Sequence, residues 1–250
     1  MPIDRSGMKL GALPSPDDDQ RLYLVDYLVP AELPKVPVQT IYYQAVTKPW
    51  GMLGNATKGD CTLAGLAHQF QLHAANQGNQ IQFDEATILK IYDQMTGGVD
   101  SGLTLLDVLK YGQKTGVQGH KIGAYVQVNL RSIVQVKAAI YLFGGLYAAV
   151  DLPIASQNQT IWDVPKGGLT GDGAPGSWGG HCVPVSDYAP YGYMCQTWGD
   201  DMPMTKRYFN AYFVEGWAII SEDWVNGNKK APNGFDLNTL QADLKVIKGK

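Results

Sequence analysis

The chain has 250 residues, of which 45% are hydrophobic and 17% are charged, and its formal net charge is −3 at neutral pH. This composition is too apolar and too weakly charged for a largely disordered chain, and the length suffices for one large domain or two lobes that share an interface. The slight negative charge argues against nucleic acid and against an anionic membrane surface as partners. A small molecule, a peptide or a protein substrate is the expected partner.

The first twenty residues contain no apolar core of signal-peptide length, so secretion by that route is not expected. No stretch approaches the roughly 20 uninterrupted apolar residues of a membrane span. The three cysteines lie far apart and form no CxxC pair, which excludes a disulfide framework and a structural zinc site as interpretations. We therefore expect a soluble protein in a reducing, cytoplasmic type of compartment, with no metal and no cofactor.

The first half of the chain divides into a strap and a helical region. Residues 1–48 are rich in proline and turn-forming residues, and we expect them to lie as an extended strap over the outside of a domain. Residues 49–145 are predicted to form a helical lobe, because apolar residues recur there at helical spacing. The predicted helices begin near Cys61, Asp84, Thr104 and Arg131. Glycines follow each of them and are expected to end them.

The second half has the pattern of strands. Residues 146–225 contain short runs of aromatic and β-branched residues separated by proline and glycine, which predicts a β lobe. The Gly-rich stretch 165–180 is too long for a hairpin turn and is predicted to line a site. Residues 226–250 form a polar tail, in which apolar residues from Leu237 to Ile247 suggest a short surface helix. Helices followed by strands predict an α+β fold with two lobes.

Cys61 is the candidate nucleophile. It follows Asp60, a plausible N-cap, so its sulfur would lie in the first helical turn, where free N–H groups and the helix dipole favour an anion. A thiol becomes a strong nucleophile when its pKa is lowered by such a position and by a nearby imidazole. The simpler interpretation is a small buried cysteine at a helix start, and Asp60 would oppose ionisation unless it caps the helix.

His181 is the candidate base. It follows Gly180 and opens an apolar strand, which would hold its ring rigidly at the edge of a cleft. His68 lies seven residues along the helix from Cys61, roughly 10 Å away, and is interpreted as a packing residue. If the two strands around residue 190 pair so that His181 faces Gln196, the Gln196 amide can fix the imidazole tautomer. The same register would place Cys182 opposite Cys195, as two packed thiols or, less favoured, as a disulfide.

At four places the sequence resembles the papain-like cysteine peptidases. The segment N-A-T-K-G-D-C at 55–61 resembles the family motif Q-G-x-C-G-S-C, and GGHCVPVSDY at 179–188 resembles its G-H-A-V-x-x-V-G-Y strand. QTWG at 196–199 resembles N-S-W-G, and the glycine pair at 97 and 98 resembles the pair that presents backbone to a substrate. The resemblance implies a helical lobe packed against an antiparallel β lobe, with the active site in the cleft between them.

The resemblance also implies roles for single residues. Cys61 would be the nucleophile, His181 the general base, Gln196 its orienting residue and Asn55 the oxyanion donor. The implied substrate-binding residues are Gly97, Gly98, Gly180 and Trp198. The sequence departs from the family at both amides, because Gln196 stands where the family has asparagine and Asn55 where it has glutamine.

The implied activity is hydrolysis of peptide bonds through an acyl-thioester on Cys61. Two alternatives stay open at this point. The altered amides are compatible with an inactive papain-like binding or structural module, since a fold does not guarantee a function. The same machinery also supports a thiol acyltransferase or an amidase, because amines as well as water resolve a thioester.

Overall fold

The structure is a computed structural model that describes residues 4–17, 22–26, 35–225, 231 and 232. The surface helix predicted between Leu237 and Ile247 lies outside the described residues. Within the described ranges, no helix has the length and apolarity needed to cross a lipid bilayer.

The described residues form five α-helices, and local capping signals are seen at the ends of several of them. They are α1 (Cys61–Asn76), α2 (Glu85–Thr96), α3 (Leu105–Lys114), α4 (Ile133–Phe143) and α5 (Lys206–Tyr212). The side chain of Asp84 accepts a hydrogen bond from the Thr87 N–H at the start of α2, and Thr104 accepts one from the Asp107 N–H at α3. Gly144 ends α4 in the left-handed conformation, at φ 70°. The four predicted helices are confirmed, whereas the short α5 was not predicted.

Six strands form one antiparallel sheet in the order β3-β8-β4-β5-β6-β7. These strands are β3 (Ile122–Gln127), β4 (Leu146–Leu152), β5 (Gly179–Tyr188), β6 (Gly192–Thr197), β7 (Asp200–Thr205) and β8 (Phe213–Ser221). Two very short strands, β1 (Ala12–Leu13) and β2 (Leu103–Thr104), pair in parallel outside this sheet. The antiparallel β lobe expected after residue 145 is therefore present.

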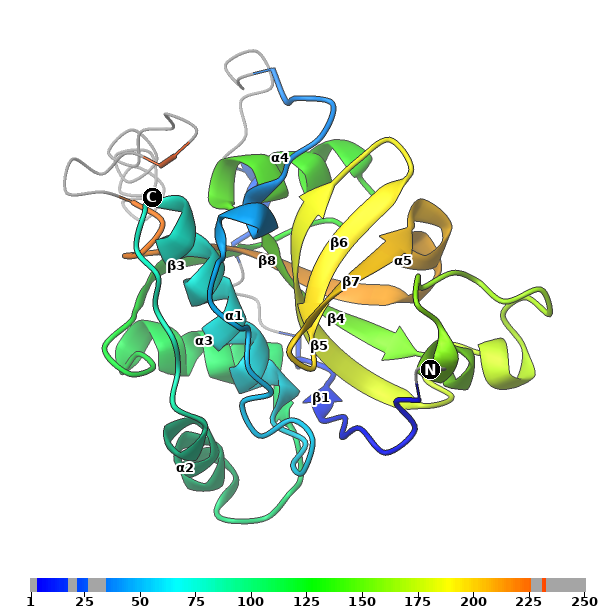
Figure 1. The fold of residues 1–250 in the computed structure, drawn as a ribbon, viewed down its shortest axis with the longest axis horizontal. Helices are drawn as coiled ribbons and strands as arrows, with labels where there is room; N and C mark the ends of the chain where they lie inside the picture. The colour runs from blue at the N-terminus through cyan, green and yellow to red at the C-terminus, as the bar shows by residue number, and fades with distance from the viewer. Residues whose placement is uncertain (1–3, 18–21, 27–34, 226–230, 233–250) are drawn as a thin grey trace.

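The sheet is buried on both faces, and the faces belong to two hydrophobic cores. Along β4, Tyr147 and Ala149 pack with α1, α2 and α3, whereas Ala148 and Val150 pack with α4 and α5. Figure 1 shows the first three helices on one side of the twisted sheet. The predicted α+β class with two lobes is confirmed. The division at residue 145 differs from the structure, because β3 and α4, both within the expected helical lobe, belong to the sheet and its far face.

Residues 8–15 of the expected strap lie between the two lobes and not over the outside of one domain. Its strand β1 pairs with β2 in the helical lobe and also lies against β5 in the sheet (Figure 1). At the far end of this segment, the Ser15 hydroxyl donates a hydrogen bond of 2.7 Å to Glu215 on β8. Residues 8–15, called the cleft segment below, therefore contact both lobes.

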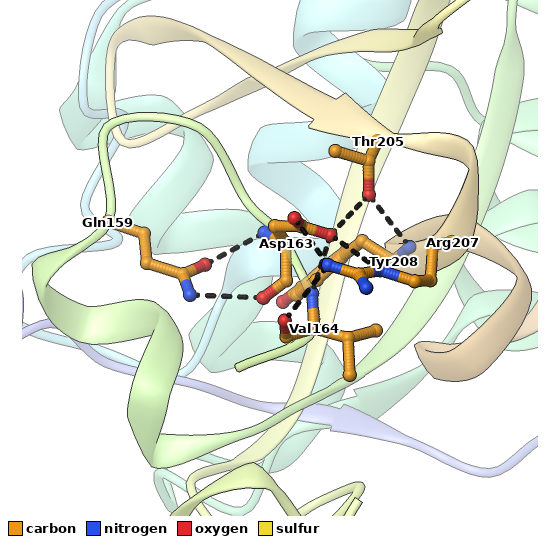
Figure 2. Close-up of polar contacts among 6 residues, drawn as sticks. All are labelled: Gln159, Asp163, Val164, Thr205, Arg207 and Tyr208. Atoms are coloured by element: carbon orange, nitrogen blue, oxygen red, sulfur yellow. Dashed lines mark hydrogen bonds and ion pairs between the residues drawn. The ribbon is translucent and has the colours of Figure 1, made fainter. Parts of the chain in front are cut away.

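A polar cluster around Asp163 fixes the loop that precedes the Gly-rich stretch (Figure 2). The Asp163 carboxylate accepts hydrogen bonds from the Thr205 hydroxyl at 2.7 Å and from the Arg207 guanidinium at 2.7 and 3.1 Å. The Gln159 side chain bonds the backbone of Asp163 through both its amide atoms. The neighbouring Trp162 is fully buried and packs edge-on against Trp198, whose ring stacks on His181. The cluster thus holds an aromatic support of the site in place.

We expect Asp163→Asn to destabilise the protein by about 1 kcal/mol or less, which is a fall in Tm of a few degrees for a chain of this size. The effect is small because Asp163 and Arg207 are 38% and 67% exposed. The hydrogen bonds from Arg207 lower the pKa of the Asp163 carboxyl in the folded protein. Its contribution is therefore complete above an unfolded pKa of about 3.9 and is lost as the pH falls through the lower folded value.

Thermal unfolding of both proteins as a function of pH tests this expectation. The difference in Tm should be constant near neutral pH and should narrow below pH about 4. Asp172→Asn is the matched control, since it removes the same charge from the exposed Gly-rich stretch and should leave Tm unchanged. A difference between wild type and Asp163→Asn that persists at the lowest pH would contradict the ion-pair explanation.

Candidate active site

Cys61 is the first residue of α1, as the sequence predicts, and only 1% of its surface is exposed. Its thiol lies against backbone N–H groups of Cys182 on β5 and of Gly11 and Ala12 in the cleft segment. The helix start, the sheet and the strap therefore meet at this sulfur atom.

The burial of Cys61 keeps its thiol protonated in this conformation. Burial raises the thiol pKa to about 12, and this effect outweighs the backbone N–H groups, which favour the thiolate. The structure therefore shows the nucleophile candidate covered and neutral.

Asp60 does not act as the helix cap that the sequence suggests. Its side chain makes no capping hydrogen bond, and the residue is completely buried beside Asn55. Burial raises the pKa of the Asp60 carboxyl to about 8, so the group is largely protonated at neutral pH. The negative charge that would oppose the Cys61 thiolate is therefore mostly absent there.

His181 lies at the start of β5 and is 1% exposed. Its Nε2 atom is 2.7 Å from the Thr197 hydroxyl, and its ring stacks on Trp198 with centroids 4.5 Å apart. No hydrogen-bond partner for the His181 Nδ1 atom is found among the described residues. With Nε2 held by Thr197, Nδ1 is the ring nitrogen available to exchange a proton with a thiol. Burial lowers the pKa of His181 to about 3, so this ring is neutral.

Trp198 owes its position to an unusual backbone. Its φ angle is +48°, in the left-handed region that non-glycine residues seldom adopt, and Gly199 follows at φ +78°. This turn places the indole flat on the His181 ring, between Trp162 and Trp178. Trp198 therefore shields the histidine; in this conformation its surface is buried.

The predicted hairpin register between β5 and β6 is wrong. Val185 pairs with Cys195, and the ladder shifts at an irregularity between Val185 and Asp187. At the Val185–Cys195 pair, on the His181 side of this irregularity, the register differs from the prediction by an odd number of residues, and such a slip turns side chains to the opposite face. As a result Thr197, and not Gln196, contacts His181.

The observed register also determines the surroundings of Gln196, Cys182 and Cys195. The Gln196 amide donates to the Ser186 hydroxyl and to Asp201, at 3.0 and 2.9 Å. Cys195 packs with α4 and α5, whereas Cys182 packs on the opposite face with Cys61. All three cysteines are free, which agrees with the favoured unbridged form, but Cys182 and Cys195 lie on opposite faces of the sheet and are therefore not packed against each other as predicted.

Asn55 lies beside the thiol region and is already engaged with the cleft segment. Its amide donates to the carbonyl oxygens of Lys9 and Lys58, at 3.2 and 3.3 Å. The Lys9 N–H donates back to the Asn55 carbonyl at 3.3 Å. The amide that the resemblance assigns to an oxyanion therefore binds a peptide carbonyl of the strap.

The predicted substrate-binding glycines have different surroundings, since Gly97 and Gly98 lie in open space whereas Gly180 touches the cleft segment. Gly97 and Gly98 end α2, and an added Cβ atom would meet nothing within 4 Å at either position. Gly102 is instead the glycine in that region whose backbone touches the extended segment, since a Cβ there would collide with the Gly11 carbonyl. Gly180 has the same relation to the Ala12 carbonyl, and Leu103 N–H donates to Gly11 O at 2.9 Å.

Four residues of this site were not found from the sequence: Thr197, Gly102, Ser15 and Glu215. Gly102 is followed by the capping residue Thr104, and a glycine just before a helix start was the available signal. The Ser15–Glu215 contact joins residues 200 positions apart and left no local signal. Thr197 is adjacent to Gln196, the residue predicted to contact His181, and only the strand register decides which of the two makes that contact.

Comparison with known proteins supports the fold through structure alone. Neither a protein-family model nor a curated protein sequence matches the chain. Among solved structures, xylellain, a cysteine protease from Xylella fastidiosa, matches with a TM-score of 0.66 at 16% identity, over 87% of this chain and 97% of that one. Procathepsin B S9 from Trypanosoma congolense matches with a TM-score of 0.62 at 12% identity, over 86% of each chain.

A third match comes from an insect. Digestive procathepsin L2 from the larval midgut of Tenebrio molitor aligns with a TM-score of 0.62 at 12% identity, over 87% of this chain and 79% of that one. The three identities lie between 12% and 16%, so these matches bear on the fold alone. The chain therefore has the fold of the papain-like cysteine proteases.

Proposed function

We propose that this chain is a cysteine peptidase that hydrolyses peptide bonds through an acyl-thioester on Cys61. The observation that carries the proposal is that the start of α1 brings the Cys61 thiol against the backbone N–H of Cys182, the residue that follows His181 in β5. A neutral imidazole with Nε2 held by Thr197 leaves Nδ1 as an acceptor for the thiol proton. The proposed substrate is a peptide or protein.

The proposed reaction uses residues in this arrangement. The Cys61 sulfur attacks the peptide carbonyl carbon while His181 holds the thiol proton, and His181 then donates that proton to the departing amine. Water, deprotonated by His181, cleaves the thioester and restores the thiol. The Asn55 amide, which now donates to the Lys9 carbonyl, would donate to the oxyanion.

The described conformation is a latent one under this proposal. With a Cys61 pKa of about 12 and a His181 pKa of about 3, both groups are neutral across the physiological range. Both shifts are caused first by burial, and the cleft segment supplies part of that burial at Cys61. Departure of residues 8–15 would admit water and bring the two pKa values closer together.

One prediction concerns the proposed nucleophile, Cys61. Cys61→Ser should abolish hydrolysis of a mixed peptide library, because a serine hydroxyl is a far weaker nucleophile in this setting. Cys195→Ser, buried on the opposite face of the sheet, is the matched control and should retain hydrolysis. Hydrolysis that survives in Cys61→Ser would overturn the proposal. Transfer to added amines without hydrolysis would identify an acyltransferase instead.

The second prediction concerns access to Cys61. Ser15 is held by Glu215 and by the Leu106 N–H, which donates to the Ser15 hydroxyl at 3.2 Å. A hydrogen bond to a charged group contributes about 1.5–3 kcal/mol, so Ser15→Ala should increase the open population roughly tenfold or more. We expect alkylation of Cys61 by iodoacetamide at pH about 6 to accelerate by that factor, measured by mass spectrometry.

Ser6→Ala is the control for this experiment, since Ser6 is exposed and lies in the strap outside the cleft segment. It should label at the wild-type rate. Equal labelling rates for Ser15→Ala and wild type would show that this contact does not limit access. Labelling of Cys61 only after denaturation, in all three proteins, would favour the inactive binding module.

A further prediction distinguishes the role of Thr197 from that of Gln196. Thr197→Ala should lower kcat at least roughly tenfold with little change in KM, because the hydroxyl orients His181 without holding substrate. Thr197→Ser keeps the hydroxyl and should retain most of the activity. Gln196→Ala should lower Tm, since Gln196 bonds Ser186 and Asp201, and should affect kcat less. A larger loss of kcat in Gln196→Ala than in Thr197→Ala would return the orienting role to Gln196.

A further inference from the structure

Two of the three thiols share one hydrophobic core at the lobe junction. Cys61 and Cys182 both pack with α1, α2 and α3, whereas Cys195 packs on the other face of the sheet. The Cys195 thiol donates to the Met202 carbonyl at 3.4 Å and has no part in the junction. Cys182 is therefore the thiol that accompanies the nucleophile.

Two contacts place Cys182 beside the start of α1. A Cβ atom at Gly65, one helical turn from Cys61, would lie 3.3 Å from the Cys182 sulfur. Residues separated by four positions in a helix have Cβ atoms about 5–6 Å apart, so this sulfur lies one turn from the nucleophile. The Cys61 thiol also contacts the backbone N–H of Cys182 itself.

Tyr147 completes the arrangement from the neighbouring strand. Its hydroxyl donates to the Thr62 carbonyl at 2.8 Å, next to Cys61, and also lies beside the Cys182 thiol. Gly65 has no side chain to separate α1 from β5, and its added Cβ would lie 3.4 Å from the Tyr147 ring. The absence of a side chain at Gly65 is therefore what brings the two cysteines into one cluster.

We propose that Cys61 and Cys182 form a reversible disulfide when the uncovered nucleophile is oxidised by a hydroperoxide, so that Cys182 protects Cys61 from irreversible oxidation. The proposal rests on the proposed function in one respect, namely that Cys61 becomes a thiolate once the cleft segment leaves. It adds a modification site that peptide hydrolysis does not require.

The chemistry has two balanced steps. In the first, the Cys61 thiolate attacks one peroxide oxygen, the O–O bond breaks, and the other oxygen leaves as water or an alcohol after taking a proton, which produces a sulfenic acid. In the second, the Cys182 sulfur attacks the Cys61 sulfur, the S–O bond breaks, and hydroxide leaves as water with the Cys182 proton. The two thiols lose two electrons in total, and the hydroperoxide gains them.

The test treats the full-length chain with dilute hydrogen peroxide for several hours, then alkylates the remaining thiols under denaturing conditions and maps the peptides by mass spectrometry. The wild-type count of free thiols should fall from three to one, with a peptide that joins Cys61 to Cys182. Dithiothreitol should restore all three thiols. The Cys195→Ala control should form the same link and lose both of its thiols.

The Cys182→Ala variant should behave differently, because its Cys61 sulfenic acid has no neighbouring thiol. Its Cys61 should gain two oxygens as a sulfinic acid that dithiothreitol does not reverse, and Cys182→Ser provides a second form of the same test. The proposal is overturned by any of three wild-type results: three unmodified thiols, a link to Cys195, or an oxidised Cys61 with Cys182 still free.

The readout does not depend on peptide hydrolysis, so the two proposals fail separately. A Cys61–Cys182 link in a chain that cleaves no peptide would leave the disulfide standing and remove the peptidase. Hydrolysis that requires Cys61, together with irreversible oxidation of Cys61 in wild type, would support the peptidase and remove the disulfide.

Discussion

The alternation of side chains along β5 is the constraint on which the site depends. Successive residues of a strand point to opposite faces, so His181 joins the aromatic residues of one core while Cys182 faces α1 in the other. The strand begins at the lobe junction, and the start of α1 is packed against it there. One strand end therefore positions His181, the backbone N–H group beside the Cys61 thiol, and the second thiol, Cys182.

Each half of the site is supported by its own core. The His181 ring rests on Trp198, which contacts Trp162, and the Asp163 cluster holds the loop that carries Trp162. Cys61 rests on α1, whose residues from Cys61 to Ala75 are all buried. Because the two supports lie on opposite faces of the sheet, a change in the aromatic core reaches the base without passing through the nucleophile.

The helices could be predicted, and Cys61 and His181 could be placed at the starts of their elements, because the signals for both are local. Helix caps at Asp84 and Thr104 and the stop at Gly144 are read from a few neighbouring residues, and Cys61 and His181 each begin an element. The partner of His181 could not be predicted, because it depends on the pairing of two strands and on an irregularity between Val185 and Asp187.

The position of the cleft segment also could not be predicted from neighbouring residues in the sequence. Proline-rich sequence indicates extended backbone but does not say which surface that backbone contacts. The cleft segment is placed by contacts with Asn55, Leu103 and Glu215, which lie from 46 to 200 residues away along the chain. Likewise, the glycine that touches it is Gly102 and not Gly97 or Gly98, a distinction that appears only when the two segments are side by side.

The cleft segment is part of the same chain as the thiol that it covers, and this has a thermodynamic consequence. An intramolecular ligand acts at an effective concentration that is typically millimolar for short flexible connections and does not change when the protein is diluted. Under the proposed function, an external peptide competes with that fixed concentration, so the fraction of uncovered Cys61 depends on the affinity and amount of the peptide and not on the amount of protein. The Ser15–Glu215 hydrogen bond, at the far end of the segment, stabilises the covered state and so contributes to the free energy that a competing peptide would have to exceed.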